Sequence, residues 1–126
     1  MTRPHPDGIS RIISRIAPDW PKTIDVGPGR FPLLARLDER LSKVAPHYVV
    51  HQVKSKFGSL CFYAQSSDDP QDYNEAFVDT IRAAEWESTS VCEECGDPAG
   101  TYTIGLWVWT LCPRHASERS GPNNAA

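Results

Sequence analysis

The C-terminal third of the sequence contains two pairs of residues that can bind a metal ion. They follow the pattern Cys-x2-Cys, 16 residues, Cys-x2-His, and they are Cys92, Cys95, Cys112 and His115. Each pair can bend its backbone into a knuckle that directs two ligand atoms at one ion, and a hairpin between the pairs completes a tetrahedron. Gly96 suits the first knuckle, because the residue after the second ligand commonly adopts a positive φ. The spacing predicts one zinc ion per chain.

Two other uses of these cysteines agree less well with the sequence. A redox Cys-x-x-Cys pair normally lies at a helix N-terminus that lowers the thiol pKa. Here the residues after Cys95 are Gly-Asp-Pro-Ala-Gly, which is typical of a turn. Disulfide bonds require an oxidising compartment and would leave a third cysteine unpaired. Zinc binding is therefore the favoured interpretation.

The predicted zinc ion has a structural role. Four protein ligands leave no coordination position for an activated water molecule. A knuckle, a hairpin and a second knuckle describe a zinc ribbon or treble clef, and Pro113 favours a helical turn after Cys112. A segment of about 28 residues buries little core, so metal binding is expected to supply most of its folding free energy.

Composition and charge exclude several functional classes. The chain has 126 residues, of which 40% are hydrophobic and 23% charged, and a formal net charge of −3. These values fit one globular domain and are poorly suited to sequence-independent binding of nucleic-acid backbones. The sequence has no apolar run long enough to span a membrane, and its first residues lack the apolar stretch of a secretory signal. We therefore expect a cytoplasmic protein with reduced thiols.

Two helices are predicted in the N-terminal part. The first has Asp7 as its N-cap and an apolar face with helical spacing, formed by Ile9, Ile12, Ile13 and Ile16. Residues 17–32 include four prolines and two glycines, which predicts a loop without regular structure. The second helix is predicted from Leu33 to Val44, with a buried face formed by Leu34, Leu37, Leu41 and Val44.

A pair of strands is predicted to follow. Tyr48–Lys56 and Leu60–Gln65 are rich in β-branched and aromatic residues, and Phe57-Gly58-Ser59 is the predicted turn between them. Because side chains alternate along a strand, the first strand should have two distinct faces. We expect Val49, Val53 and Phe57 on one face, and Gln52, Lys54 and Lys56 on the other.

A third helix completes an α+β fold. It is predicted from Pro70 to Ser88, with a buried face formed by Tyr73, Phe77, Ile81 and Ala84. The resulting fold is a small antiparallel sheet packed with helices, followed by a zinc ribbon or treble-clef-like knuckle. We expect one domain, 1–126, made of a core at 1–90, a zinc-binding segment at 91–118 and a flexible tail at 119–126. The hairpin of the zinc-binding segment is predicted at Tyr102–Leu111.

No pattern in the sequence indicates catalysis. It contains no phosphate-binding loop, Ser-His-Asp pattern or paired-histidine metal motif, so we predict that the protein is not an enzyme. A polar loop is predicted at Ser66–Asp72, and solvation explains its carboxylates, which are Asp68, Asp69 and Asp72. Cys61 is expected to be a small buried side chain. His47 and His51 lack ligand spacing and are expected at the surface or half-buried.

Two groups of residues are candidates for partner binding. The first is a strand-face strip formed by Gln52, Lys54 and Lys56, with Tyr63 beside it. Such a strip serves either to recognise a phosphate or an acidic partner or to maintain solubility and prevent edge pairing. The second group is Trp107 and Trp109, which alternate on one hairpin face. They either pack over the third helix against Trp86 or form an exposed aromatic contact patch.

Three segments of the sequence form a combined pattern. They are Gln52–Tyr63 (QVKSKFGSLCFY), Cys92–Gly100 (CEECGDPAG) and Trp109–Ala116 (WTLCPRHA). In order and spacing they resemble a family of small zinc-knuckle proteins encoded by bacteriophages and prophages, over the region from Gly29 to Ala116. This chain differs in having Arg30-Phe31 in place of a tryptophan, and Cys61 in place of a basic residue. The resemblance implies a phage origin and a pair of zinc knuckles, without a particular chemistry.

These observations favour a binding function. We expect a zinc-stabilised, non-enzymatic interaction protein, encoded by a phage, that binds and modulates or inhibits an unidentified host protein. The analogy is with small phage accessory proteins that block host machinery, including defence systems. The alternative is a nucleic-acid-binding regulatory protein that uses the zinc hairpin together with Lys54 and Lys56. Salt-dependent binding to DNA or RNA would distinguish the two.

Overall fold

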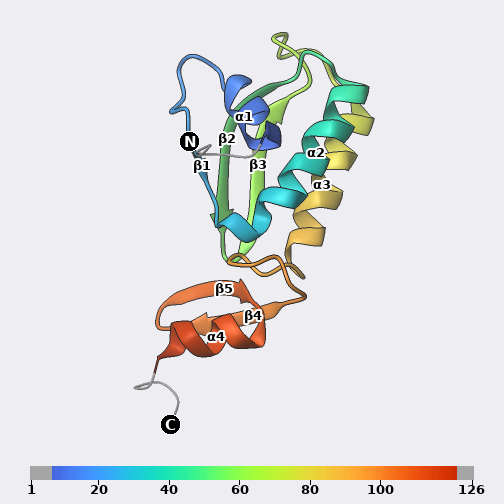
Figure 1. The fold of residues 1–126 in the computed structure, drawn as a ribbon. Helices are drawn as coiled ribbons and strands as arrows, with labels where there is room; N and C mark the ends of the chain where they lie inside the picture. Colours follow the sequence, from blue (N-terminus) through green and yellow to red (C-terminus); the bar gives the residue numbers. More distant parts are fainter. Residues whose placement is uncertain (1–6, 122–126) are drawn as a thin grey trace.

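The computed structural model describes residues 7–121 and has an α+β fold, as the sequence predicts. A three-stranded sheet carries helices on one face, and a two-stranded hairpin with a short helix lies beyond one end of that sheet (Figure 1). In chain order the elements are α1 (Asp7–Ser14), β1 (Ile24–Asp25), η1 (Pro28–Arg30), α2 (Phe31–Val44), β2 (Val49–Lys56), β3 (Ser59–Gln65), α3 (Glu75–Ser88), β4 (Gly100–Ile104), β5 (Trp107–Leu111) and α4 (Pro113–Ser120).

Helix α1 forms where its isoleucine spacing predicts it. Ile9 and Ile12 are fully buried, and Ile16, just beyond the helix, pairs with Val50 of β2. The side chain of Asp7, the predicted N-cap, is not among those that the structure describes. Residues 17–32 do not form the predicted loop without regular structure, because they contain β1 and the 3-10 helix η1. A two-residue strand is defined by its partner, here Val53 opposite Ile24, so local composition does not reveal it.

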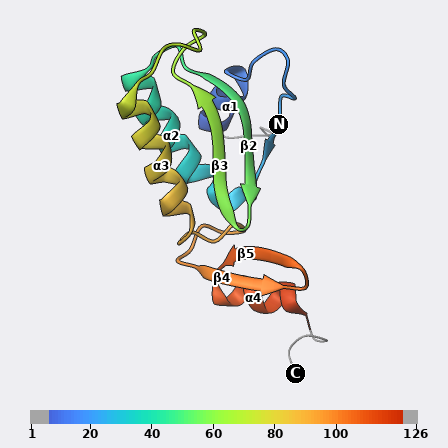
Figure 2. The same ribbon diagram turned by 180° about the vertical axis from the view of Figure 1, so that it is seen from behind.

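The two long helices lie side by side against the sheet (Figures 1 and 2). Helix α2 starts at Phe31 instead of Leu33, with a proline in its first turn, where a missing N–H group is harmless. Its apolar face is buried except for Val44, which is 38% exposed at the helix end. Helix α3 starts at Glu75 instead of Pro70, because Asn74 caps it by accepting a hydrogen bond from the Phe77 amide.

Tyr73 is the clearest error in the predicted core. It precedes the N-cap of α3 instead of lying on the buried face of that helix, and it is 74% exposed. The remaining residues predicted on that face, Phe77, Ile81 and Ala84, are buried. They join the main hydrophobic core, which consists of residues from α1, α2, β2, β3 and α3, of Ile16 just after α1, and of the Ala45–Tyr48 connection.

Strands β2 and β3 form an antiparallel hairpin whose alternation is interrupted by a bulge. The register shifts between Val50 and Gln52, so Val50 and Val53 are the buried residues of β2. The predicted common face of Val49, Val53 and Phe57 is therefore wrong, and Phe57 is 77% exposed in the turn. The outer face of the sheet is open when viewed from behind (Figure 2).

The C-terminal segment folds as a hairpin followed by a helix. Strands β4 and β5 pair from Gly100–Leu111 to Ile104–Trp107 around a two-residue turn at Gly105 and Leu106. Helix α4 extends to Ser120, two residues into the predicted flexible tail, of which 122–126 lie outside the described residues. A small second hydrophobic cluster lies between this hairpin and α4. Within the described part of the chain, no helix combines the length and apolar character needed to cross a membrane.

Candidate metal centre

The structure brings the four predicted ligands together. The Sγ atoms of the three cysteines and a ring nitrogen of the histidine lie within 4.8 Å of one another. Two of the ligands lie in the turn before β4, and the other two lie at the start of α4, after β5. Hairpin β4–β5 therefore provides the return path that closes the site, as the 16-residue spacing predicts.

The first knuckle is a tight turn stabilised by hydrogen bonds to Cys92. Its Sγ accepts a hydrogen bond from the Glu94 amide at 3.4 Å, and its carbonyl accepts one from the Gly96 amide at 3.0 Å. Gly96 has φ 85°, so the expected positive φ at this position is confirmed. Cys95 is exposed, whereas Cys92 is completely buried.

The second knuckle coincides with the N-terminus of α4. Cys112 is the N-cap, and its Sγ accepts a hydrogen bond from the His115 amide at 3.5 Å. Pro113 occupies the first turn, as the sequence predicts. The knuckle places His115 in that first turn, with Nδ1 3.3 Å from Cys112 Sγ and 3.6 Å from Cys92 Sγ.

The separations between ligand atoms fit a tetrahedral ion. With Zn–S and Zn–N bonds of about 2.3 Å and 2.1 Å, tetrahedral geometry places two sulfurs about 3.8 Å apart and a sulfur and a nitrogen about 3.6 Å apart. The observed Cys95–Cys112 sulfur separation is 3.8 Å, and the two sulfur–nitrogen separations are 3.6 Å and 3.3 Å. A disulfide would require about 2.05 Å. The arrangement is therefore suited to a metal ion and not to a disulfide bond.

The thiols of the first knuckle differ in acidity. Burial raises the pKa of Cys92, but hydrogen bonds from the backbone of Cys112, Cys95 and Glu94 outweigh burial and lower it to about 6. A backbone hydrogen bond from Asp97 lowers the pKa of Cys95, but burial and the neighbouring Cys92 and Cys112 thiols raise it to about 11. Ionised Cys92 therefore disfavours ionisation of Cys95, and a cation bound between the two sulfurs would offset this repulsion.

Histidine coordination through Nδ1 also determines the state of its other nitrogen. Arg114 Nη2 lies 3.3 Å from His115 Nε2. When Nδ1 binds a metal, Nε2 carries the proton of the neutral imidazole. Two N–H donors then face each other, so this exposed contact is not a hydrogen bond in the metal-bound form.

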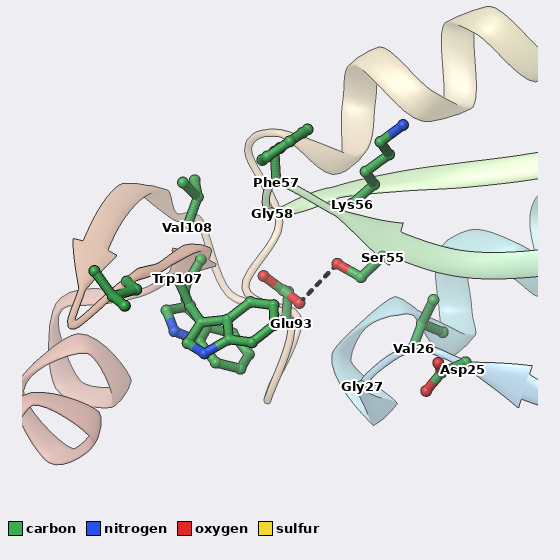
Figure 3. A pocket seen from close by; sticks show the side chains of 12 residues that line it. Asp25, Val26, Gly27, Ser55, Lys56, Phe57, Gly58, Glu93, Trp107 and Val108 are labelled. Atoms are coloured by element: carbon green, nitrogen blue, oxygen red, sulfur yellow. Dashed lines mark hydrogen bonds between the residues drawn. The ribbon is translucent and has the colours of Figure 1, made fainter.

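Glu93 joins the first knuckle to the core, and sequence reasoning did not identify it. Its buried carboxylate accepts hydrogen bonds from Ser55 Oγ at 3.1 Å and from the Thr110 amide at 2.8 Å. Figure 3 shows this side chain between the hairpin and the end of β2. Its backbone exchanges further hydrogen bonds, donating to Thr110 and accepting from Gly29. The knuckle is thereby attached to the core and to the hairpin at one point.

Two glycines of the 17–32 segment allow the backbone of the knuckle to approach. A Cβ atom on Gly29 would lie 2.1 Å from the Cys92 carbonyl oxygen, and one on Gly27 would lie 2.2 Å from the Glu93 carbonyl oxygen. Real Cβ atoms do not approach a backbone oxygen so closely. The Gly-Pro-Gly sequence at 27–29 could have indicated this close backbone contact, but its composition is equally typical of a loop.

Arg30 is a fully buried cation beside this attachment. Its Nη2 donates to the Gly58 carbonyl at 2.6 Å, and its Nε donates to the Val91 carbonyl at 3.5 Å. Its Nη1 has no partner in the described part of the chain. Burial lowers the pKa of Arg30, while the negative charges of Glu93 and Cys92 oppose that change. Three thiolates and one divalent cation carry one net negative charge, which a buried guanidinium compensates.

The candidate partner residues lie in two places. Lys54 and Tyr63 lie on the open outer face of the sheet, with Lys54 Nζ 6.0 Å from the Tyr63 ring centroid. Gln52 pairs with Tyr63, so it belongs to the same face, and Lys56 lies near the turn with its Nζ 5.9 Å from the Phe57 ring centroid. Cys61, opposite Lys54, is only partly buried, whereas a buried side chain is expected from the sequence.

The hairpin tryptophans do not pack on α3. Trp107 is 72% exposed, and Trp86 is 79% exposed, so their predicted contact is wrong. Trp109 packs in the second hydrophobic cluster, with the Arg119 guanidinium 3.9 Å above its ring. Arg119 also pairs with the Glu94 carboxylate, which ties α4 to the first knuckle.

The histidines outside the metal centre and the loop carboxylates lie where the sequence predicts them. His47 is exposed and His51 is partly buried, as predicted. The loop carboxylates are exposed, as expected for solvated groups, and they are Asp68, Asp69 and Asp72.

Comparison of the chain with models of known protein families, with curated proteins and with solved structures found no match.

Proposed function

We propose that the chain binds one structural zinc ion through Cys92, Cys95, Cys112 and His115. The observation that carries this proposal is the set of ligand separations, which agree with a tetrahedral Cys3His site. A knuckle, a hairpin and a ligand pair at the start of a helix correspond to a treble-clef arrangement. Four protein ligands leave the ion no position for water, so the proposed zinc stabilises the fold and performs no catalysis.

The function that this site supports best is that of a zinc-stabilised, non-enzymatic interaction protein. Several large apolar side chains are exposed near the hairpin and its junction with the core, among them Phe57, Leu106 and Trp107. Exposed aromatic side chains of this kind are typical anchors of protein interfaces. The resemblance to phage-encoded proteins supports a phage origin, and the analogy with small phage accessory proteins supports a host protein as partner.

A nucleic-acid-binding function has weaker support. The outer sheet face carries Lys54 and Lys56, but two lysines on a chain of net charge −3 form no extended basic surface. Binding to DNA or RNA that decreases steeply with salt would contradict the protein-interaction proposal.

Metal content tests the zinc proposal directly. Protein purified without added metal should contain close to one zinc equivalent, and Cys112→Ser should lose it, because the sulfur at the start of α4 is removed. Cys61→Ala is the matched control: its thiol lies on the outer sheet face, away from the cluster, and its zinc content should not change. Full zinc retention by Cys112→Ser, or zinc loss in Cys61→Ala, would refute the ligand assignment.

A further inference from the structure

A groove of about 540 Å³ lies where the hairpin β4–β5 meets the end of the three-stranded sheet. Figure 3 shows Glu93 in this groove, with Trp107 and Val108 on the hairpin side and Ser55 and Asp25 on the sheet side. Its size lies within the range of sites that bind ligands or peptide side chains. Three features of its lining indicate what it binds.

The first feature is the strained and exposed Phe57. It has φ 52° and is followed by Gly58 with φ 82°, as in the type I′ turns that favour Asn-Gly. A bulky residue with positive φ is an outlier, and with 77% exposure Phe57 gains little from burial in this fold. A phenylalanine at this position therefore does not stabilise the fold, whereas contact of its ring with a partner would account for it.

The turn of the β4–β5 hairpin adds further exposed apolar side chains to the same groove. Leu106 is 97% exposed and Trp107 is 72% exposed, and both line the groove together with Phe57. The β2–β3 turn and the β4–β5 turn come from separate parts of the fold. The hydrogen bonds of Glu93 to Ser55 and Thr110 hold the two hairpins together. Apolar side chains on both sides of a groove are suited to holding a chain that lies between them.

The second feature is an open strand edge. The Thr110 amide and carbonyl both bind Glu93, so they point away from β4. In an antiparallel pair this orientation repeats at every second residue, so the amide and carbonyl of Val108 point the same way. Among residues 7–121, neither group has a hydrogen-bond partner on that side. Val108 lines the groove, so an extended chain lying there can form hydrogen bonds with β5.

The third feature is charge. Asp25 and Glu93 contribute two carboxylates and Lys56 one ammonium group to the lining, which leaves one net negative charge. Asp25 forms no ion pair within the described chain. The Trp107 ring is largely exposed, and an indole face attracts cations. Arg119 over Trp109 shows the same contact within this molecule.

We propose that this groove binds an extended, basic segment of a partner protein. The segment forms hydrogen bonds with β5 at Val108, places a Lys or Arg side chain against Trp107 in the negative potential of Asp25 and Glu93, and packs apolar residues on Phe57 and Leu106. This inference rests on the proposed interaction function and names the surface and the kind of partner. The net negative lining disfavours a phosphate backbone as the occupant.

The test is selection from a random 12-residue peptide library displayed against the zinc-loaded chain. Selected peptides should carry Lys or Arg alternating with apolar residues, and one of them should protect the Val108 amide from hydrogen exchange. Trp107→Ala and Asp25→Asn should each weaken its binding at least tenfold. Trp86→Ala and Asp79→Asn are matched controls, because they change an exposed tryptophan and an exposed aspartate on α3, outside the groove. Both controls should bind normally.

The other outcomes would overturn the proposal. These are failure to select any peptide, selection of acidic peptides, binding that survives Trp107→Ala, and Val108 protection that rises with protein concentration when no peptide is present. The last outcome would identify a second copy of this chain as the occupant. Zinc content is measured for every variant. Any of these outcomes in protein that retains one zinc equivalent refutes this inference alone, whereas a parent chain that contains no zinc refutes the proposed function.

Discussion

Arg30 is a buried guanidinium between the first knuckle and the β2–β3 turn, and a buried charge is unfavourable unless its surroundings compensate it. Its compensation comes from two carbonyl acceptors and from the negative charges of Glu93 and Cys92. The sequence gives no local signal for this role, because an arginine before a helix is ordinarily solvated. Its burial follows from the close packing of the knuckle on Gly29.

Replacing Arg30 tests its role toward the metal centre. Arg30→Met retains much of the side-chain length but removes the guanidinium hydrogen bonds to the Gly58 and Val91 carbonyls and leaves the thiolates uncompensated. The Gly58 carbonyl keeps the hydrogen bond from the Thr110 hydroxyl. We expect a loss of about 2 kcal/mol in unfolding free energy and zinc affinity that is roughly tenfold weaker, measured by denaturation and by chelator competition. Arg30→Lys should recover part of the affinity.

Arg36→Met provides the control for Arg30→Met. Arg36 forms an exposed ion pair with Glu87, and such pairs contribute less than about 1 kcal/mol. Its zinc affinity should equal that of the parent chain. Equal zinc affinities for the parent and Arg30→Met would show that Arg30 does not compensate the charge of the thiolates.

Gly29→Ala tests the close approach of the two backbones. The added methyl group would meet the Cys92 carbonyl oxygen, and the resulting displacement should destabilise the fold by about 1–3 kcal/mol and weaken zinc binding. Gly100→Ala is the matched control, because no atom lies within 4 Å of its added Cβ. Thermal denaturation of both variants measures the difference. A Gly29→Ala chain as stable as Gly100→Ala would contradict the packing described here.

At the scale of elements, hydrophobic spacing predicted the long helices and the β2–β3 hairpin but not their details. The periodicity of Leu34, Leu37 and Leu41 is a local property, so it predicts α2 and its buried face. The bulge at Val50–Gln52 and the pairing of β1 with β2 depend on a partner strand. Such non-local features are absent from any single stretch of sequence.

The β2–β3 turn offers a test of strain within an element. Phe57→Asn places at the first turn position a residue that tolerates positive φ. Because Phe57 is 77% exposed, little burial is lost, and we expect a gain of about 1 kcal/mol in unfolding free energy. Tyr73→Asn, at an equally exposed aromatic residue without positive φ, should give no gain. Urea denaturation measures both, and a destabilised Phe57→Asn chain would show that the aromatic ring contributes to folding.

At the scale of the whole molecule, the structure contains two apolar clusters connected by a polar junction. The main cluster ends with Ala84 of α3, and the second lies entirely after Ser90. The spacing of the metal ligands is readable in the sequence, because a chelating pair is a local motif. The junction was not predicted, since Arg30, Glu93 and Thr110 are far apart in sequence and show no pattern.

This organisation predicts unequal responses to metal removal. The main cluster contains no metal ligand, so α1, α2 and α3 should persist when a strong chelator removes zinc. The second cluster includes Cys92 and Cys112 themselves, so β4, β5 and α4 should unfold without the ion. Loss of the Glu93 and Arg30 hydrogen bonds at the junction should destabilise the remaining core by about 2–4 kcal/mol without unfolding it.

The measurement is tryptophan fluorescence beside far-UV circular dichroism, in a Trp20→Phe, Trp86→Phe chain that retains only the hairpin tryptophans. Chelator should change the fluorescence of Trp107 and Trp109 and leave most of the helical signal, and added zinc should restore the fluorescence. Urea should then unfold the chelated core at a lower concentration than the zinc-loaded chain, because the junction is lost. A single transition in which fluorescence and helical signal disappear together would show that the junction makes both clusters one cooperative unit, in which the metal stabilises the core as well as the hairpin.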